Sequence, residues 1–325
     1  MIAGANVTDG ETDGVMAVRA EGQGMISVII PHFNQPALLD RCLASIVGQI
    51  DSGWAAEVIV VDNGSTVGPE QVLARYPSVQ LFRETEAGPG PARTLGAQKA
   101  KGEILAFVDA DCQVAPDWLA AIGRLFQDRS VEIAGGEVLI LHEDPSHPTA
   151  YEAYESEFGF RQEFYVKRDH YSATCNLIMR RGNMAKVGPF GGIAIAEDRD
   201  WGHRARALGL SITWAPTVVV YHPARATFAE LARKWDRLTG HAFEMQAQGF
   251  AGKLRWALKG LAMGFSAPAA LPRLLRSRRI KGGLAARISA FAVLVRIRLY
   301  RAKLMLRLLA TGGAGKKAAR WRDQG

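Results

Sequence analysis

The chain has 325 residues, of which 48% are hydrophobic and 22% are charged. This length can hold one large α/β domain and an additional region, and the composition is that of an ordinary globular protein, not of a disordered chain. The formal net charge is +8, but its distribution is uneven. Residues 253–325 contain 18 lysines and arginines and the single acid Asp323, whereas the preceding part is mildly acidic.

The cysteines and the first residues indicate the cellular compartment of the protein. Cys42, Cys112 and Cys175 are odd in number and widely spaced, so they match neither a zinc site nor a disulfide framework, which favours a reducing compartment. Residues 1–24 lack a basic start and an apolar core, so we expect a mobile N-terminal extension and no signal peptide.

Apolar runs alternate with helical patterns along the next two thirds of the chain. The runs predict strands at 25–31, 56–62, 79–82, 104–108, 131–141 and 173–179. Periodic segments between them predict helices at 36–47, 69–76, 89–101, 117–128 and 197–208. Residues 151–171 are aromatic and charged, and we expect helix and loop beside a cleft. The alternation predicts an α/β fold with a mostly parallel, doubly wound sheet.

One strand ends on a pair of acids. The buried run Ile104–Val108 is followed by Asp109 and Asp111, and open α/β sheets bind ligands at the carboxyl ends of their strands. Two carboxylates at such an edge suit Mg²⁺ or Mn²⁺ shared with phosphate oxygens. A solvated turn would have the same sequence, so the neighbouring motifs have to decide between the two.

Two helix starts add candidate residues. The segment 88–93 opens a helix, and its two prolines remove donors that a dinucleotide loop would use. Arg93 in the first turn is a candidate phosphate contact, with a plain surface arginine as the alternative. Glu197 and Asp198 open a later helix, where acids are common because they favour the positive end of the helix dipole.

Six segments in this order resemble one known family. They are PHFN (31–34), VVDNGST (60–66), GPGPARTLG (88–96), FVDAD (107–111), TCNLIMRR (174–181) and AEDRDWGHRARALG (196–209). The set resembles family-2 glycosyltransferases of the GT-A fold over residues 25–240. The resemblance implies a Rossmann-like, mostly parallel sheet flanked by helices, in a GT-A domain at 25–240. Composition and charge add an N-terminal extension (1–24) and a basic helical tail (241–325) on either side of it.

The resemblance also implies roles for residues on the donor side. Pro31, Phe33 and Asn34 would border the nucleotide, and Asp62 would hydrogen-bond its base. Asp109 and Asp111 match the metal-binding pair of the family, with Asp111 as the direct ligand and Asp109 also near the nucleotide. His222 lies where many relatives place a further metal or phosphate contact, although a capping or packed histidine would read the same.

On the acceptor side, Asp198 falls at the position of the family's general base, with Glu197 beside it. Cys175 and Asn176 lie in the segment expected near the acceptor. Trp201 is a candidate for stacking on an acceptor sugar, but it also fits an apolar helix stripe. Arg199 or Arg204 is expected to keep Asp198 ionised, and Arg204 is alternatively a surface partner of Asp200.

The activity expected from this resemblance is transfer of one sugar, with inversion, from a nucleotide-diphosphate sugar to a hydroxyl of a saccharide or lipid-linked acceptor. Uridine is the expected base and a divalent metal, Mg²⁺ or Mn²⁺, the expected cofactor. The Gln-x-x-Arg-Trp signature of processive synthases is absent, which favours one sugar per encounter. A nucleotidyltransferase and a non-catalytic nucleotide-sugar-binding relative that acts through its tail remain alternatives.

The basic tail predicts a surface partner. Its longest uncharged piece, 260–272, is shorter than the roughly 20 residues of a spanning helix. Arginines recur on two opposite stripes of the predicted helix 284–309, with apolar residues between them. We expect an anionic membrane surface as the partner, with partner helices as an alternative and nucleic acid disfavoured. The protein would then lie in the cytoplasm, peripherally on the inner face of the cell membrane.

Overall fold

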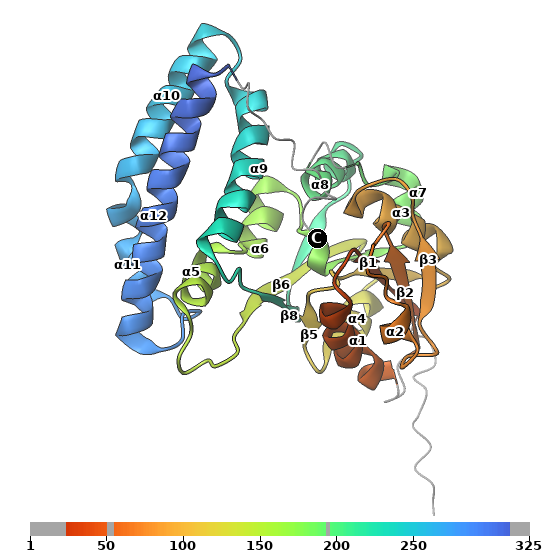
Figure 1. The fold of residues 1–325 in the computed structure, drawn as a ribbon. Helices are drawn as coiled ribbons and strands as arrows, with labels where there is room; N and C mark the ends of the chain where they lie inside the picture. The colour runs from red at the N-terminus through yellow and green to blue at the C-terminus, as the bar shows by residue number, and fades with distance from the viewer. Residues whose placement is uncertain (1–23, 51–54, 193–195, 313–325) are drawn as a thin grey trace, which may run out of the picture.

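The computed structural model describes residues 24–50, 55–192 and 196–312. In this part, an eight-stranded sheet carries helices on both faces, and a group of helices stands beside it (Figure 1). The strands are β1 (Ile26–His32), β2 (Ala56–Asp62), β3 (Gln80–Arg83), β4 (Ile104–Phe107), β5 (Gln113–Val114), β6 (Ile133–Leu141), β7 (Leu177–Arg180) and β8 (Ile212–Pro223).

The order of the strands is β3-β2-β1-β4-β7-β6-β8-β5. The pairs β1–β2, β1–β4, β2–β3 and β6–β8 are parallel, whereas β7 and β5 run antiparallel to their neighbours. This confirms the predicted mostly parallel sheet. The two-residue strand β5 was not predicted. The strand expected at 173–179 starts later, because residues 174–176 form a 3₁₀ turn, η2 (Thr174–Asn176), before β7.

The sheet is buried on both faces, which explains the continuous apolar runs of its central strands. Side chains alternate along a strand, so Val28 and Ile30 of β1 join one apolar cluster and Ile29 joins the other. The helices of this part are α1 (Pro36–Ile50), α2 (Glu70–Leu73), α3 (Pro89–Lys99), α4 (Trp118–Gln127), α5 (Ala150–Phe158), α6 (Gln162–Phe164), the π-helix η1 (Tyr165–Asp169), α7 (Gly182–Val187) and α8 (Glu197–Ala207).

The remaining helices form what we call the helical region. It comprises α9 (Phe228–Gln246), α10 (Gly249–Phe265), η3 (Ala267–Ala270), α11 (Leu271–Arg276) and α12 (Gly283–Ala310). The helix predicted at 284–309 is confirmed as α12, which packs on α5, α9 and α10 (Figure 1). The division expected at residue 240 falls inside α9, and the domain boundaries stay a prediction. No helix of the described residues has the length and apolarity needed to span a bilayer.

The buried side chain of Asn176 connects β6, β8 and α4. Its Nδ2 donates to the carbonyl oxygens of Glu137 (2.8 Å) and Val218 (2.9 Å), and its Oδ1 accepts from Trp118 Nε1 (3.2 Å). The register of β6 and β8 shifts between Gly136 and Glu137, and a Cβ on Gly136 would lie 2.2 Å from Asn176 Nδ2. The buried amide therefore satisfies the backbone groups that this β-bulge leaves without ladder partners.

Replacing Asn176 with Ala should destabilise the protein. The variant leaves two carbonyls and an indole N–H buried without partners, which should lower the free energy of unfolding by about 2–4 kcal/mol. Urea denaturation followed by circular dichroism measures this change. The control Lys167→Ala removes an exposed ion pair with Glu163 and should cost less than about 1 kcal/mol. Equal effects of the two variants would contradict the bracing role of Asn176.

Candidate active site at the carboxyl ends of the strands

The ends of β1 and β2 hold a buried pair of hydrogen-bonding side chains. His32 and Asp62 are opposite each other in the parallel register, and His32 Nδ1 lies 3.1 Å from Asp62 Oδ1. The other carboxylate oxygen accepts from the backbone N–H of Ser65 at 3.3 Å. Asp62 is thereby fixed at the strand end. The predicted hydrogen bond of Asp62 to the nucleobase of the donor stays a prediction. In that case the nucleobase would share this carboxylate with His32 and Ser65.

Asn34 connects the two loops that follow these strands. Its backbone is left-handed (φ 52°), a conformation that Asn tolerates better than most residues. Its Oδ1 accepts from the backbone N–H groups of Thr66 (2.8 Å) and Val67 (3.1 Å). These contacts hold the β1–α1 loop against the loop after β2. The residues predicted to border the nucleotide lie together at this edge of the sheet: Pro31, Phe33, Asn34 and Asp62.

Arg93 joins two acids that are far apart in sequence. Its Nη2 lies 2.5 Å from Asp109 Oδ1 at the end of β4, and its Nη1 lies 3.1 Å from Glu197 Oε1 at the start of α8. Burial alone would lower the pKa of Arg93, but the two carboxylates overcome this effect and raise it. The phosphate contact of Arg93 stays a prediction, and the structure shows another use of this side chain, which is only 4% exposed and binds acids through both terminal nitrogens. In this arrangement Arg93 positions the two acids.

The loop before α8 is anchored to α3. The backbone N–H of Phe190 donates to Thr94 Oγ1 at 3.0 Å, and a Cβ on Gly90 would lie 2.0 Å from the carbonyl oxygen of Gly191. Trp201 is fully buried against Phe190, and its Nε1 donates to the carbonyl oxygen of Gly188 at 3.1 Å. Of the two roles considered for Trp201, stacking on an acceptor sugar or a place in the apolar helix stripe, the structure shows the second. The indole anchors α8.

Asp198 has the environment of a weak base. Burial and the neighbouring Glu197 raise the pKa of Asp198 to about 6, while the N–H of Arg199 donates to its carboxylate at 2.7 Å. The positive charges that favour its ionised form belong to Arg93 and Arg237. Arg204, an expected partner, binds Asp200 at 2.8 Å instead.

Two tyrosines and an arginine near Asp198 were not predicted as site residues. Tyr165 and Tyr171 stack with ring centroids 5.0 Å apart. Burial raises the pKa of both phenols, and the charge of Asp198 adds to this effect. Arg237 reaches this area from α9. The aromatic stretch 151–171 was the one sequence signal for the tyrosines, but it did not single out these two.

A second acid lies opposite a histidine. Asp111 Oδ2 is 3.5 Å from His222 Nε2 at the end of β8, and both side chains are partly exposed. One ligand atom from each of Asp111, Cys112 and His222 lies within 4.8 Å of the others. Burial raises the pKa of the Cys112 thiol well above its usual value, so it stays protonated and is a poor ligand for a hard cation. Asp109, predicted as a second ligand, is outside this group and binds Arg93.

The chemistry of His222 fits a divalent cation. Its Nδ1 lies 2.6 Å from the carbonyl oxygen of Pro223, which can only accept a hydrogen bond, so Nδ1 carries the proton. In the neutral ring, Nε2 then presents a lone pair to a carboxylate oxygen. Two acceptor atoms that face each other are favourable only with a proton or a cation between them. Metal-binding histidines usually donate their other N–H to a protein acceptor, as Nδ1 of His222 does to Pro223. Asp111 and His222 are thus a suitable pair of ligands.

Two further residues expected on the acceptor side have buried side chains. Cys175 is 3% exposed, and its free thiol forms a hydrogen bond with the thiol of Cys112. This hydrogen bond lowers the pKa of Cys175, but burial and the nearby acids outweigh it and raise the pKa. Asn176 is fully buried and its amide is used in bracing the bulge. Both side chains are therefore used inside the protein, and their role at the acceptor stays a prediction. Glu197 lies beside Asp198 as expected, but its carboxylate binds Arg93.

Comparisons with known proteins agree on one family. A sequence model described as glycosyl transferase family 2 matches residues 27–185. Glycosyltransferase AglE of Haloferax volcanii is 32% identical over 219 residues, which are 66% of this chain and 71% of that protein.

Solved structures share the fold. A mannosyltransferase from Pyrobaculum calidifontis, in complex with GDP-Man and Mn²⁺, has a TM-score of 0.57 at 20% identity, over 89% of this chain and 87% of that one. Residues 1–349 of S. aureus TarS, in complex with UDP-GlcNAc, have a TM-score of 0.50 at 15% identity, over 89% and 91%. With the sheet and its acidic edge, these matches establish that the chain is a glycosyltransferase of family 2 with the GT-A fold.

Proposed function

We propose that this enzyme transfers one sugar from a nucleoside diphosphate sugar to an acceptor hydroxyl with inversion, using Asp198 as the general base. The observation that carries the proposal is the bridge from Asp109 through Arg93 to Glu197, which holds Asp198 near the acidic end of β4. The proposed base and the proposed donor-binding edge of the sheet thereby lie next to each other. We infer a uridine nucleotide as donor and a saccharide or lipid-linked alcohol as acceptor from the resemblance of the motifs.

In this mechanism Asp198 removes the acceptor proton. The acceptor oxygen forms a bond to the anomeric carbon while the bond from that carbon to the diphosphate oxygen breaks, and the electron pair leaves with the diphosphate. Attack from the face opposite the leaving group inverts the configuration. A pKa of about 6 suits this role, because the carboxylate is ionised near neutral pH yet more basic than an ordinary Asp.

We propose that Asp111 and His222 hold a divalent cation. One oxygen and one nitrogen ligand favour Mn²⁺ over Mg²⁺, which takes oxygen ligands almost exclusively. When bound, the cation would neutralise charge that develops on the leaving diphosphate. The tautomer of His222 and the position of Asp111 are set by the protein itself, through Pro223 and the end of β4.

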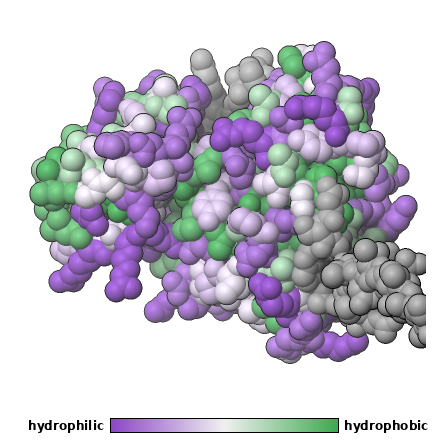
Figure 2. All heavy atoms as spheres, turned by 90° about the horizontal axis from the view of Figure 1, so that it is seen from below, coloured by the Kyte–Doolittle hydropathy of each residue, from purple (hydrophilic) through white to green (hydrophobic). Residues whose placement is uncertain are grey.

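We also propose that the helical region lies on an anionic membrane surface. Five exposed apolar residues repeat along one face of α10 at spacings of four or three: Phe250, Leu254, Leu258, Leu261 and Phe265. Lys253 and Arg255, also exposed, lie on either side of this stripe. Figure 2 shows apolar side chains gathered at the outer edge of the helical region, next to strongly hydrophilic ones. A basic helix with an exposed apolar face suits an anionic interface.

Replacing Asp198 with Asn should remove the base and leave the donor site. Turnover should fall by about 10²–10⁴-fold, with donor affinity within a factor of about 3. Initial rates and calorimetric binding of UDP-sugars, with GDP-Man as a comparison donor, measure the two effects. The control Asp200→Asn, which removes a surface partner of Arg204, should keep most activity. Unchanged turnover in Asp198→Asn would exclude this residue as the base.

The activity should depend on pH through Asp198. The base must be ionised, so kcat/KM should decrease as the pH falls through about 6. Glu197→Gln removes a like charge that raises the pKa of Asp198, so the acidic limb of the profile should move to lower pH. Rate profiles from pH 4.5 to 8 measure the acidic limb of the wild type and of the variant. A profile of Glu197→Gln shifted to higher pH would contradict this assignment.

Binding to vesicles should depend on the stripe of α10. The full chain should sediment with phosphatidylcholine vesicles that contain phosphatidylglycerol, and weakly with pure phosphatidylcholine. The double variant Phe250→Glu/Phe265→Glu should lower this affinity by at least about tenfold, since each buried Phe contributes roughly 2 kcal/mol. Leu208→Glu changes an exposed apolar residue outside the helical region and should bind normally. Equal sedimentation of the double variant and the wild type would refute this surface.

A further inference from the structure

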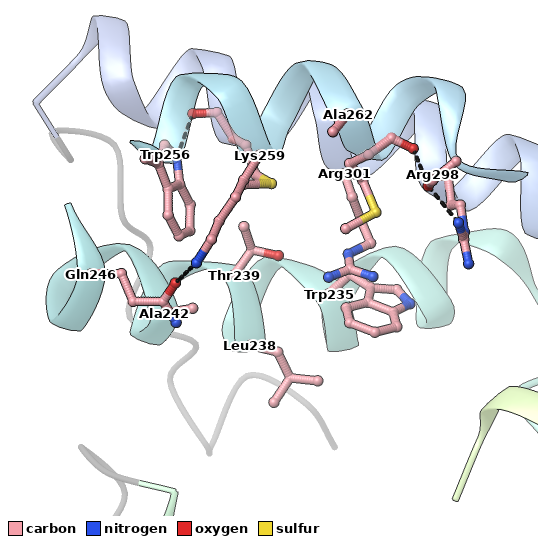
Figure 3. A pocket seen from close by; sticks show the side chains of 13 residues that line it. Trp235, Leu238, Thr239, Ala242, Gln246, Trp256, Lys259, Ala262, Arg298 and Arg301 are labelled. Carbon is pink, nitrogen blue, oxygen red and sulfur yellow. Dashed lines mark hydrogen bonds between the residues drawn. The ribbon is translucent and has the colours of Figure 1, made fainter. Parts of the chain in front are cut away.

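A pocket of about 540 Å³ lies between α9, α10 and α12 (Figure 3). Residues of the candidate active site are not among those that line it. The walls from α9 and α10 include Trp235, Leu238 and Trp256, and α12 contributes Met305. This volume is within the range of small-molecule sites. The pocket is therefore a concave site separate from the acidic edge of the sheet.

Cations line this pocket without an acid among them. Lys259, Arg298 and Arg301 contribute the positive charges. The Arg301 guanidinium lies 3.6 Å from the centroid of the Trp235 ring, and burial lowers the pKa of Arg301 to about 10. Neither arginine forms a salt bridge within the described part of the chain, while Arg298 donates to Ser266 Oγ. Both arginines are partly buried, and partly buried positive charge without a carboxylate favours binding of an anion.

Unpartnered polar atoms point to the same ligand. Thr239 is 4% exposed and lines the pocket, and its Oγ1 has no hydrogen-bond partner among the described residues. The same holds for the buried Nε of Arg301. Buried polar groups are nearly always hydrogen-bonded, so a donor hydroxyl and a guanidinium N–H without partners are unusual. In Figure 3, Thr239 and Arg301 come from different helices into the space beside Trp235.

The apolar walls indicate the rest of the ligand. Leu238, Ala242 and Met263 offer no polar side-chain atom other than a thioether, and the two indoles add large apolar faces. A free inorganic anion would leave these walls in contact with water. An amphiphile would cover them with its hydrocarbon part while its charged end meets the arginines. Arginine binds phosphate oxygens through two parallel N–H groups, and it does so better than lysine.

We propose that this pocket binds a phosphate-bearing amphiphile, a lipid phosphate, with its phosphate at Arg301, Arg298 and Thr239 and its hydrocarbon chain along the apolar wall. The site does not depend on the transfer reaction. It is also distinct from the vesicle-binding stripe: Phe250, Leu254 and Leu258 do not line the pocket. Failure of one proposal therefore leaves the others standing.

The test uses the full chain and dodecyl phosphate below its critical micelle concentration, with binding measured by titration calorimetry. We expect one molecule bound per chain. Arg301→Gln and Arg298→Gln should each weaken binding by at least about tenfold, the loss of a charge-assisted hydrogen bond. Arg307→Gln is the matched control, because it removes an exposed arginine of the same helix that does not line the pocket, and its affinity should stay within about twofold.

Several results would overturn the proposal. One is absence of dodecyl phosphate binding, and another is wild-type affinity in both pocket variants. Equal affinity for uncharged dodecyl maltoside would show that the phosphate is not recognised. Displacement by an equal concentration of inorganic phosphate would indicate a site for the free anion. Circular dichroism checks folding, and should Arg301→Gln not fold, Arg298→Gln, which keeps the contact of Arg301 with Trp235, decides the question.

Discussion

The ion bridge at Arg93 is the constraint on which the arrangement of the site depends. A guanidinium that is 4% exposed is stable only with opposite charges close by, and the bridge supplies them from the end of β4 and the start of α8. The first turn of α3 thereby sets the distance between two segments that are about ninety residues apart in sequence. Asp198 follows Glu197 directly, so the position of the proposed base depends on this bridge.

A second constraint on α8 comes from the protein core. Trp201 fills the core beside Phe190, and Thr94 holds the loop before α8. Trp201, which the sequence offers as a contact for an acceptor, therefore holds the backbone of α8 in place. The candidate edge has acids and histidines at strand ends, such as Asp62 with His32 and Asp111 with His222. Large residues support it from within the protein.

Much of this could be predicted from the sequence. Strand runs such as Ile104–Val108 are apolar throughout because both faces of the sheet are covered, and acids directly after them, such as Asp109 and Asp111, must lie at one edge. Partners could not be predicted in the same way. Nothing local to Arg93 indicates that Glu197 will reach it, and Asn176 and Trp201 have the same residue types whether they face a ligand or the core. Burial is decided by contacts that are distant in sequence.

The most direct test is a crystal structure of the full chain with Mn²⁺ and a non-hydrolysable nucleoside diphosphate sugar, with the metal located by anomalous diffraction. The account predicts a manganese peak between Asp111 and His222, Arg93 still bound to Asp109 and Glu197, and the Asp198 carboxylate facing the anomeric carbon from the side opposite the diphosphate. A metal bound elsewhere, or Asp198 turned away from the sugar, would contradict it.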